Sequence, residues 1–337
     1  MTSADILNNI HQILDSCSSI LISGQGNPDG DSVGAQLALY DILLQENAYF
    51  RHADPLDIVI ANDEMPPAVY GFLPHIDRII PAEQVADRHF DAGFILDAST
   101  DRTGQVLPIL QRCRHTINID HHRTRAANTD TIPWVEPDKS SVCEMVYDFF
   151  EHPAWHAVLT PDIAACLYAG IIYDTGTFRY PTATARTLRI AATLVDTGIN
   201  FSRIVEQLLL EKSRVALNLL TAVLNDLYWD DSGEIVVGAI SQELWHRLGV
   251  QIGDEDGVIT QYAFTKESKV AVLLRELPSG EIKVSFRSRG ALDVGQLAHS
   301  LHQQGGGHPR AAGCTLSGPL NEVQHRVVGA LQQALAQ

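Results

Sequence analysis

Acidic and imidazole side chains gather at four places in the first part of this chain, which has 337 residues. The four groups are Asp29 with Asp31, Asp97, Asp120 with His121 and His122, and Asp174. Carboxylate oxygens bind hard cations, and neutral imidazole adds a donor that suits Mn, Fe or Zn. If the fold brings these groups together, they could hold two cations about 3.5–4 Å apart with one shared carboxylate, an arrangement that activates water for hydrolysis.

Each group also has an ordinary structural explanation. The segment 27–32 contains Pro, Asp, Gly and Ser, which are typical of a solvated turn and a helix N-cap. A lone Asp97 after an apolar run could likewise cap a turn. A dinucleotide-binding loop that starts at Gly24 and Gly26 would need glycine at position 29, where the chain has Asp. Because four unrelated turns would rarely produce this series, the sequence favours a metal site.

The elements around these groups indicate an open α/β sheet. Apolar runs typical of parallel strands alternate with helical patterns. Strands are predicted at 19–23, 57–61, 92–96 and 116–119, and helices at 32–45, 140–150, 161–172 and 184–197. The acidic groups follow the strands 19–23, 92–96 and 116–119 or the helix 161–172. In such a sheet, ligands bind beyond the carboxyl ends of the strands.

The second half of the chain changes pattern and predicts a smaller α+β domain. A helical region at 201–227 is interpreted as a connector and the start of this domain. Strands are predicted at 234–240, 269–276 and 281–287, and helices at 241–248, 293–303 and 320–335. The predicted division is residues 1–198, a helical connector at 199–227, and residues 228–337.

Charge and composition exclude several classes of protein. The chain carries 24 Lys+Arg and 41 Asp+Glu, a formal net charge of −17, which disfavours binding of long duplex nucleic acid but permits short anionic substrates. Its apolar runs are shorter than the ~20 residues of a membrane span. The five cysteines are scattered without a CxxC pair, so a disulfide scaffold and a thiolate zinc site are not expected. These features predict a cytoplasmic protein.

Several motifs, taken in order, resemble a known family. PDGDS at 28–32, Asp97, DHH at 120–122 and YDTGTF at 173–178 are similar to the four motifs of the DHH phosphoesterase superfamily. GGGHPRAAG at 305–313 resembles the signature of the associated DHHA1 domain, and the segment 286–288 resembles the strand before it. The length and two-domain layout are most similar to the NrnA-type branch of oligoribonucleases and pAp phosphatases.

The resemblance implies a role for each matching residue. Asp29 and Asp97 would hold a first metal, and Asp97 would bridge to a second metal held also by Asp31, His121 and Asp174. His122 would contact the scissile phosphate or a water, and Asp120 would orient the histidines. The substrate-binding residues of the second domain would be Arg287, Ser288, Gly306, Gly307 and His308. Two divalent cations are implied, with Mn2+ favoured over Mg2+ or Co2+.

One position departs from the family pattern. The first motif usually begins with His four residues before the first Asp, and this chain has Gln25 there. A carboxamide oxygen is a weaker ligand than imidazole. The departure implies a retuned first metal site, rescue by a neighbouring group, or low activity.

The expected function is hydrolysis of short single-stranded oligoribonucleotides, of a 3′,5′-bisphosphate nucleotide (pAp), or of both, by a homodimer. One alternative is a phosphodiesterase for cyclic di-AMP or linear pApA. The other, motivated by Gln25, is a nucleotide- or metal-binding module without turnover.

Overall fold

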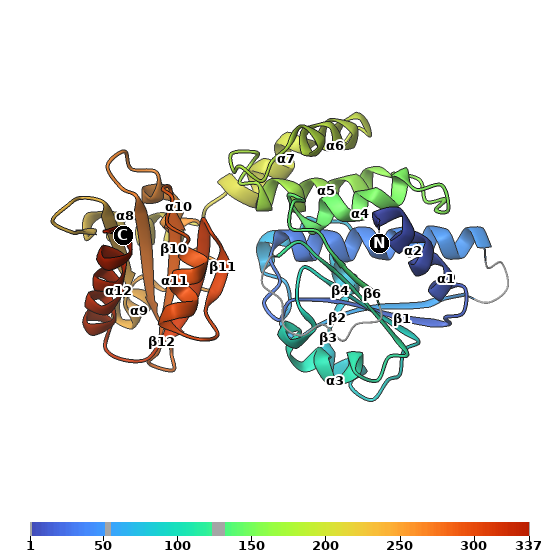
Figure 1. Cartoon of the computed structure of the whole chain (residues 1–337), viewed down its shortest axis with the longest axis horizontal. Coiled ribbons are helices and arrows are strands. Elements are labelled where there is room, and N and C mark those ends of the chain that lie inside the picture. The colour runs from blue at the N-terminus through green and yellow to red at the C-terminus, as the bar shows by residue number, and fades with distance from the viewer. Residues whose placement is uncertain (1, 51–54, 123–131, 337) are drawn as a thin grey trace. The chain divides into compact units, whose positions relative to one another are not determined.

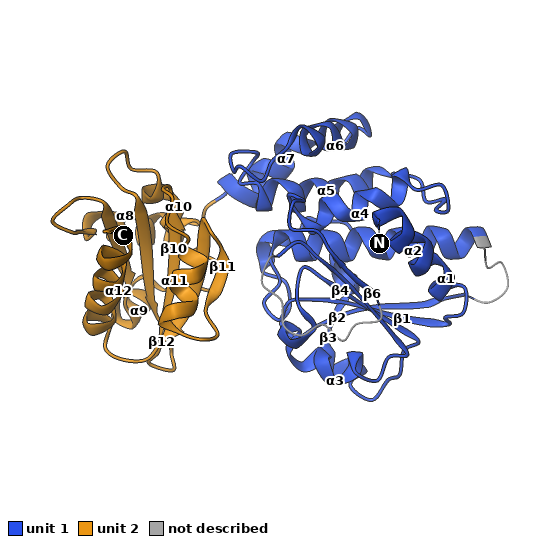
Figure 2. Cartoon of the chain, viewed as in Figure 1, with its two compact units in different colours: residues 1–211 blue, residues 212–337 orange. Residues whose placement is uncertain are grey.

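The computed structural model describes residues 2–50, 55–122 and 132–336. The chain forms two compact units, residues 1–211 and 212–337 (Figure 2). The division between the units lies inside the segment 199–227 that is expected to be the connector.

The first unit is built on a six-stranded parallel sheet with the order β3-β2-β1-β4-β5-β6. Its strands are β1 (Ser19–Gly24), β2 (Asp57–Asn62), β3 (Ile79–Pro81), β4 (Ala92–Leu96), β5 (His115–Asp120) and β6 (Ile132–Val135). The open parallel sheet and the four predicted strands are confirmed. The two edge strands, β3 and β6, were not predicted, because each is short and contains a proline. Proline within a sheet is found mainly in edge strands, where its missing N–H group costs no ladder hydrogen bond.

Helices cover both faces of this sheet (Figure 1). The covering helices are α1 (Ser3–Leu14), α2 (Gly30–Phe50), α3 (Leu107–Leu110), α4 (Val142–Glu151) and α5 (Pro161–Asp174), and α6 (Ala185–Asp196) and α7 (Phe201–Val205) pack outside them against α5. Ile20 and Phe94 belong to the core shared with α2, α4 and α5, whereas Leu21 and Ile95 belong to the core on the opposite face with α3. The predicted helices are confirmed as α2, α4, α5 and α6. The sequence reading missed α1, although Thr2 and Asp5 form a capping box at its start.

Glycines let α2 and α5 pack closely beside the sheet. A Cβ atom on Gly34 would lie 2.4 Å from the carbonyl oxygen of Cys166. A Cβ atom on Gly170 would lie 2.3 Å from Cys143 Sγ and 2.9 Å from Asp31 Oδ1. The missing side chains therefore allow Asp31, at the start of α2, to lie next to the last turns of α5.

The predicted helical region 201–227 consists of three segments instead of one helix. Helix α7 runs into a π-helical turn, η6 (Glu206–Leu210), and α8 spans Arg214–Asn225. Ser213 caps α8 by accepting a hydrogen bond from the backbone N–H of Ala216 at 2.9 Å. A Ser N-cap starts a new helix, so the chain breaks just before it.

The second unit is a mixed six-stranded sheet with helices, as predicted for an α+β domain. Its strand order is β11-β12-β10-β9-β8-β7, with β8 and β9 parallel and the other pairs antiparallel. The strands are β7 (Tyr228–Trp229), β8 (Ile235–Ile240), β9 (Val270–Glu276), β10 (Ile282–Ser288), β11 (Gly306–His308) and β12 (Ala311–Leu316). Its helices besides α8 are α9 (Gln242–Leu248), α10 (Val258–Ala263), α11 (Val294–Leu301) and α12 (Leu320–Leu335). The three predicted strands are confirmed as β8, β9 and β10.

Candidate metal centre

The candidate centre lies at the carboxyl edge of the parallel sheet, where the strand order reverses. β1 pairs with β2 on one side and with β4 on the other, so the loops that leave β1 and β4 diverge. Asp29 and Asp31 follow β1, and Asp97 follows β4. This reversal is the place where open α/β sheets bind ligands.

Asp97 lies at the middle of the cluster. It is 3% exposed, and its Oδ1 lies 3.6 Å from His121 Nε2 and 3.6 Å from His122 Nδ1. Among the described residues, this oxygen has no hydrogen-bond partner. The backbone of Asp97 has a φ of +60°, a left-handed conformation that costs a non-glycine residue energy and is found at functional sites. The buried, unsatisfied carboxylate oxygen fits a metal ligand.

Two groups of donors share Asp97. One group is Asp31, Asp97 and His121, and the other is Asp97, Asp120 and His122. Within each group the potential ligand atoms lie within 4.8 Å of one another. A carboxylate that belongs to two adjoining groups has the position that a bridging ligand requires.

The first of these groups also contacts Asp174 at the end of α5. Asp174 Oδ2 lies 3.0 Å from His121 Nε2, and Asp31 Oδ2 lies 4.0 Å from the same nitrogen. On its other side, His121 Nδ1 lies 3.2 Å from the backbone carbonyl oxygen of Lys139. With Nδ1 bonded to this carbonyl, Nε2 faces the carboxylates and is the atom that would bind a cation. Lys139 was missed by sequence reasoning, because any residue type can supply a carbonyl.

Helix α4 holds the carboxylate of Asp31. Asp31 Oδ2 accepts a hydrogen bond from the backbone N–H of Val142 at 2.6 Å, and Oδ1 accepts one from Cys143 at 2.9 Å. Val142 and Cys143 are the first two residues of α4, where unpaired N–H groups carry partial positive charge. This contact fixes Asp31 in a site where its side chain is completely buried.

Asp120 orients His122 directly. Its Oδ1 lies 2.7 Å from His122 Nδ1 and accepts a hydrogen bond from the backbone N–H of His122 at 3.0 Å. Against the effect of burial, these hydrogen bonds lower the pKa of Asp120. Asp120 therefore contacts His122, and the carbonyl oxygen of Lys139 contacts His121.

Asp29 and Gln25 lie on the β1 side of the centre. Asp29 Oδ1 accepts hydrogen bonds from the backbone N–H groups of Asp31 and Ser32, each at 3.1 Å, so this oxygen caps α2. Neither of the two donor groups that share Asp97 includes Asp29. Gln25 Nε2 donates to Asp97 Oδ2 at 3.5 Å, which shows that its side chain points into the centre.

The charges of the cluster favour cations. Burial and the charge of Asp174 raise the pKa of Asp31 to about 6. Burial and the charges of Asp29 and Asp31 raise the pKa of Asp97 well above its usual range. Although burial alone would lower it, contact with Asp174 raises the pKa of His121 to about 10. Buried carboxylates that repel one another to this degree, together with the open Asp97 oxygen, fit divalent cations held by oxygen and nitrogen ligands.

The predicted substrate-binding residues of the second unit lie at one end of its sheet. In the strand pairs, Arg287 of β10 and His308 of β11 both lie opposite Ala311 of β12. Gly307 has a φ of +137°, and a Cβ atom there would lie 2.6 Å from the carbonyl oxygen of Ala311. The hydroxyl of Ser288 donates to the carbonyl of Leu292 at 2.8 Å. Arg287 and His308 therefore lie on either side of Ala311, one strand apart from β12 in each direction, while Ser288 stabilises a turn.

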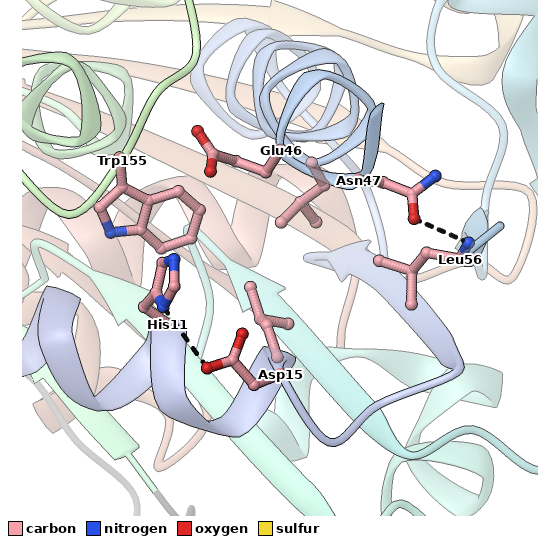
Figure 3. Close-up of a pocket in the computed structure, with 8 residues that line it drawn as sticks. His11, Asp15, Glu46, Asn47, Leu56 and Trp155 are labelled. Carbon is pink, nitrogen blue, oxygen red and sulfur yellow. Dashed lines mark hydrogen bonds and ion pairs between the residues drawn. The ribbon is translucent and has the colours of Figure 1, made fainter. Parts of the chain in front are cut away.

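A small cavity of about 30 Å³ lies elsewhere in the first unit (Figure 3). Its lining comprises His11, Leu14, Asp15, Leu43, Glu46, Asn47, Leu56 and Trp155. The His11 ring packs edge-on against Trp155, with 5.6 Å between ring centroids. At 1.5 Å per helical residue, Asn47 lies about 24 Å along α2 from Asp31. None of the predicted site residues lines this cavity, so it is separate from the candidate centre.

Known proteins resemble this chain along most of its length. Residues 19–171 match the DHH family, N-terminal domain, and residues 237–337 match the DHHA1 domain. The bifunctional oligoribonuclease and PAP phosphatase NrnA of Thermus thermophilus is 30% identical over 323 residues, which are 94% of this chain and 90% of that protein. The cyclic-di-AMP phosphodiesterase GdpP of Bacillus subtilis is 23% identical over 334 residues, which are 97% of this chain and 50% of that protein.

A solved structure shows the same fold. The exopolyphosphatase-related protein of Bacteroides fragilis superimposes with a TM-score of 0.86 at 22% identity, over 98% of this chain and 96% of that one. Among the described residues, no helix has the length and apolar character needed to cross a membrane. The order of the motifs, the shared Asp97 and these matches lead to one conclusion: the chain belongs to the DHH family and carries a DHHA1 domain.

Proposed function

We propose that this chain is a metal-dependent phosphoesterase that hydrolyses short oligoribonucleotides and pAp. The observation that carries the proposal is the buried carboxylate of Asp97, which lies among donor atoms of Asp31, His121 and His122 and has one oxygen without a hydrogen-bond partner among the described residues. The similarity to the NrnA of Thermus thermophilus, over nearly the whole of both chains, supports the substrate class.

We assign each side chain of the centre a role. Asp31, Asp97, His121 and Asp174 would hold one cation. Asp97 would bridge to a second cation, for which Asp29 is the further predicted ligand. Mn2+ is the proposed metal because the set mixes carboxylate oxygens with an imidazole nitrogen. When bound, the two cations would polarise the phosphate and lower the pKa of a water.

His122 and the second unit would handle the substrate. The hydrogen bond from Nδ1 to Asp120 fixes the His122 ring, so Nε2 can contact an oxygen of the scissile phosphate. Arg287 and His308 would bind the part of the nucleotide away from that phosphate, since a guanidinium recognises phosphate with two parallel hydrogen bonds. Gly306 and Gly307 would expose backbone N–H groups to the same anion.

A substrate panel crossed with metals tests the proposal. The panel comprises pAp, RNA of two to five nucleotides, a long RNA duplex and cyclic di-AMP, each with Mn2+, Mg2+ or Co2+. We expect metal-dependent release of mononucleotide from short RNA and of phosphate from pAp, with negligible activity on the duplex. No turnover on any member with any metal would contradict the proposal and favour the binding module that Gln25 motivated.

A second candidate keeps the same centre and changes the substrate. The similarity to the GdpP of Bacillus subtilis, a cyclic-di-AMP phosphodiesterase, favours it, although the chain spans half of that protein. Faster hydrolysis of cyclic di-AMP than of short RNA would select this candidate. The homodimer and the cytoplasmic location stay predictions from the sequence.

Replacing Gln25 by His should tighten the first metal site. The side chain of Gln25 already reaches Asp97 Oδ2, and an imidazole there would add a stronger donor than an amide. We expect Gln25→His to lower the Mn2+ concentration for half-maximal activity several-fold, with a smaller effect at saturating metal. Gln111→His, at an exposed position on the far side of the sheet from α2, controls for an added imidazole. Superimposable activation curves for Gln25→His and wild type would contradict a role for residue 25 at the metal.

A further inference from the structure

The residues just before α4 and in its first turn contact two proposed ligands of the candidate centre, one histidine and one carboxylate. The carbonyl of Lys139 contacts His121, and the backbone N–H groups of Val142 and Cys143 hold Asp31. We name residues 139–143 the support segment. Its backbone groups contact two proposed ligands of the same cation, His121 and Asp31. A displacement of this segment would move both ligands.

A buried carboxylate anchors the support segment from its other side. Glu144 is 2% exposed, and its Oε2 accepts hydrogen bonds from the hydroxyl of Ser140 at 2.5 Å and from the backbone N–H of Ser140 at 3.3 Å. The hydroxyl of Thr187, in the first turn of α6, donates to the same oxygen at 2.8 Å. Its Oε1 lies 3.6 Å from Nε of Arg186. Glu144 thus ties the support segment to the start of α6.

The bonds of Glu144 differ from those of an ordinary helix cap. The pattern Ser141-x-x-Glu144 predicts a capping box, in which Glu would bond back to the N–H of Ser141. In the structure, Ser141 accepts from the N–H of Glu144 at 3.0 Å, while Glu144 bonds to Ser140 and to α6. A buried carboxylate is costly unless several groups bond to it. Glu144 therefore contributes more to the conformation of the support segment than to the stability of α4.

A second contact reaches the same segment through Lys139. Its Nζ lies 2.9 Å from Asp148 Oδ2, and Asp148 in turn pairs with Arg186. Arg186 also pairs with Glu151 Oε2 at 2.9 Å, on the exposed side of α4. The guanidinium consequently lies near two buried carboxylates of α4, Glu144 and Asp148, and one exposed carboxylate, Glu151. Glu144 and Glu151 therefore provide a matched pair of variants.

We propose that Glu144 is a positioning residue for the cation held by Asp31 and His121. It acts through the support segment, whose carbonyl and N–H groups set the orientation of both ligands, and it contacts neither substrate nor metal. The inference rests on the metal centre of the proposed function. Outer partners that orient metal ligands typically contribute about 10–100-fold to metal affinity.

The test measures Mn2+ binding to the cation-free full chain by electron paramagnetic resonance of the free ion, with no substrate present. Wild type should bind two Mn2+, and Glu144→Gln should weaken one of them at least tenfold. Ser140→Ala removes one hydrogen bond and should give a smaller loss in the same site. Glu151→Gln, which removes the exposed partner of Arg186, should change neither affinity by more than about twofold.

Two further readouts separate positioning from general stability. At saturating Mn2+, kcat of Glu144→Gln should recover to near the wild-type value, because the ligands themselves remain. The double variant Ser140→Ala with Glu144→Gln should bind Mn2+ no more weakly than Glu144→Gln alone, since both changes break the same contact.

Unchanged Mn2+ affinities in Glu144→Gln, with only a lower unfolding temperature, would overturn the inference, and so would equal losses in Glu151→Gln and Glu144→Gln. Wild type that binds no Mn2+ would overturn it together with the metal centre. Because binding is measured without substrate, failure to hydrolyse the substrate panel contradicts the proposed function alone.

Discussion

Replacing Asp97 by Asn should remove both cations and reduce turnover more than a hundredfold. Asp97 is the one ligand assigned to both cations, so the loss of its charge affects each of them. Calorimetric titration with Mn2+ and the rate of pAp hydrolysis measure the two effects. Retention of more than about a tenth of wild-type activity would contradict the bridging assignment.

Asn is chosen in place of Ala so that a loss of activity does not result from a change in the fold. Asp97 has a left-handed backbone, which Asn accepts more readily than Ala. Burial and neighbouring carboxylates raise the pKa of Asp97 well above its usual range, so its ionised form is unfavourable in the cation-free protein. The cation-free Asp97→Asn variant should therefore unfold at the same temperature as wild type or higher. A lower unfolding temperature would show that lost activity reports damage to the fold.

Asp31→Asn should lose one cation selectively. Asp31 is assigned with Asp97, His121 and Asp174 to one cation and lies in a donor group with Asp97 and His121, whereas the other cation is assigned to Asp97 and Asp29. Mn2+ binding should fall from two ions to one, and kcat should fall about 10²–10³-fold, the usual effect of removing one electrostatic contact to a reacting group. Two Mn2+ bound with wild-type affinity would contradict the assignment.

Asp41→Asn provides the matched control for this change. Asp41 is a second buried carboxylate on α2, 9% exposed, and its Oδ2 lies 3.4 Å from Nε2 of His75, which belongs to neither donor group. Its replacement should leave both cations bound.

Asp31→Asn should also lower the free energy of unfolding by about 1–3 kcal/mol, because the amide of Asn cannot accept from both N–H groups that hold Asp31. Addition of saturating Mn2+ would not restore this loss.

The strands of the first unit could be predicted because their sequences are locally unambiguous. The run 92–96 is fully buried and coincides with β4, and the polar residue after it is Asp97. Parallel strands covered on both faces require continuous apolar runs, which are visible without any knowledge of their neighbours. The break at 211–213 was not visible in this way, because apolar residues continue with helical spacing on either side of it.

The sequence by itself determined which donors are available and the elements that carry them: Asp31 after a strand, Asp97 at the end of another, the histidines after a third. Only the tertiary structure decided that Asp174 contacts His121, that Gln25 points at Asp97, and that Asp29 caps α2. These outcomes depend on how closely α2 and α5 approach at Gly34 and Gly170, and on backbone groups of residues 139–143. Hydrophobic periodicity reports the exposure of each residue along its own element. Ligand geometry depends instead on packing between distant elements and on carbonyl and N–H groups that every residue type carries, so local pattern cannot specify it.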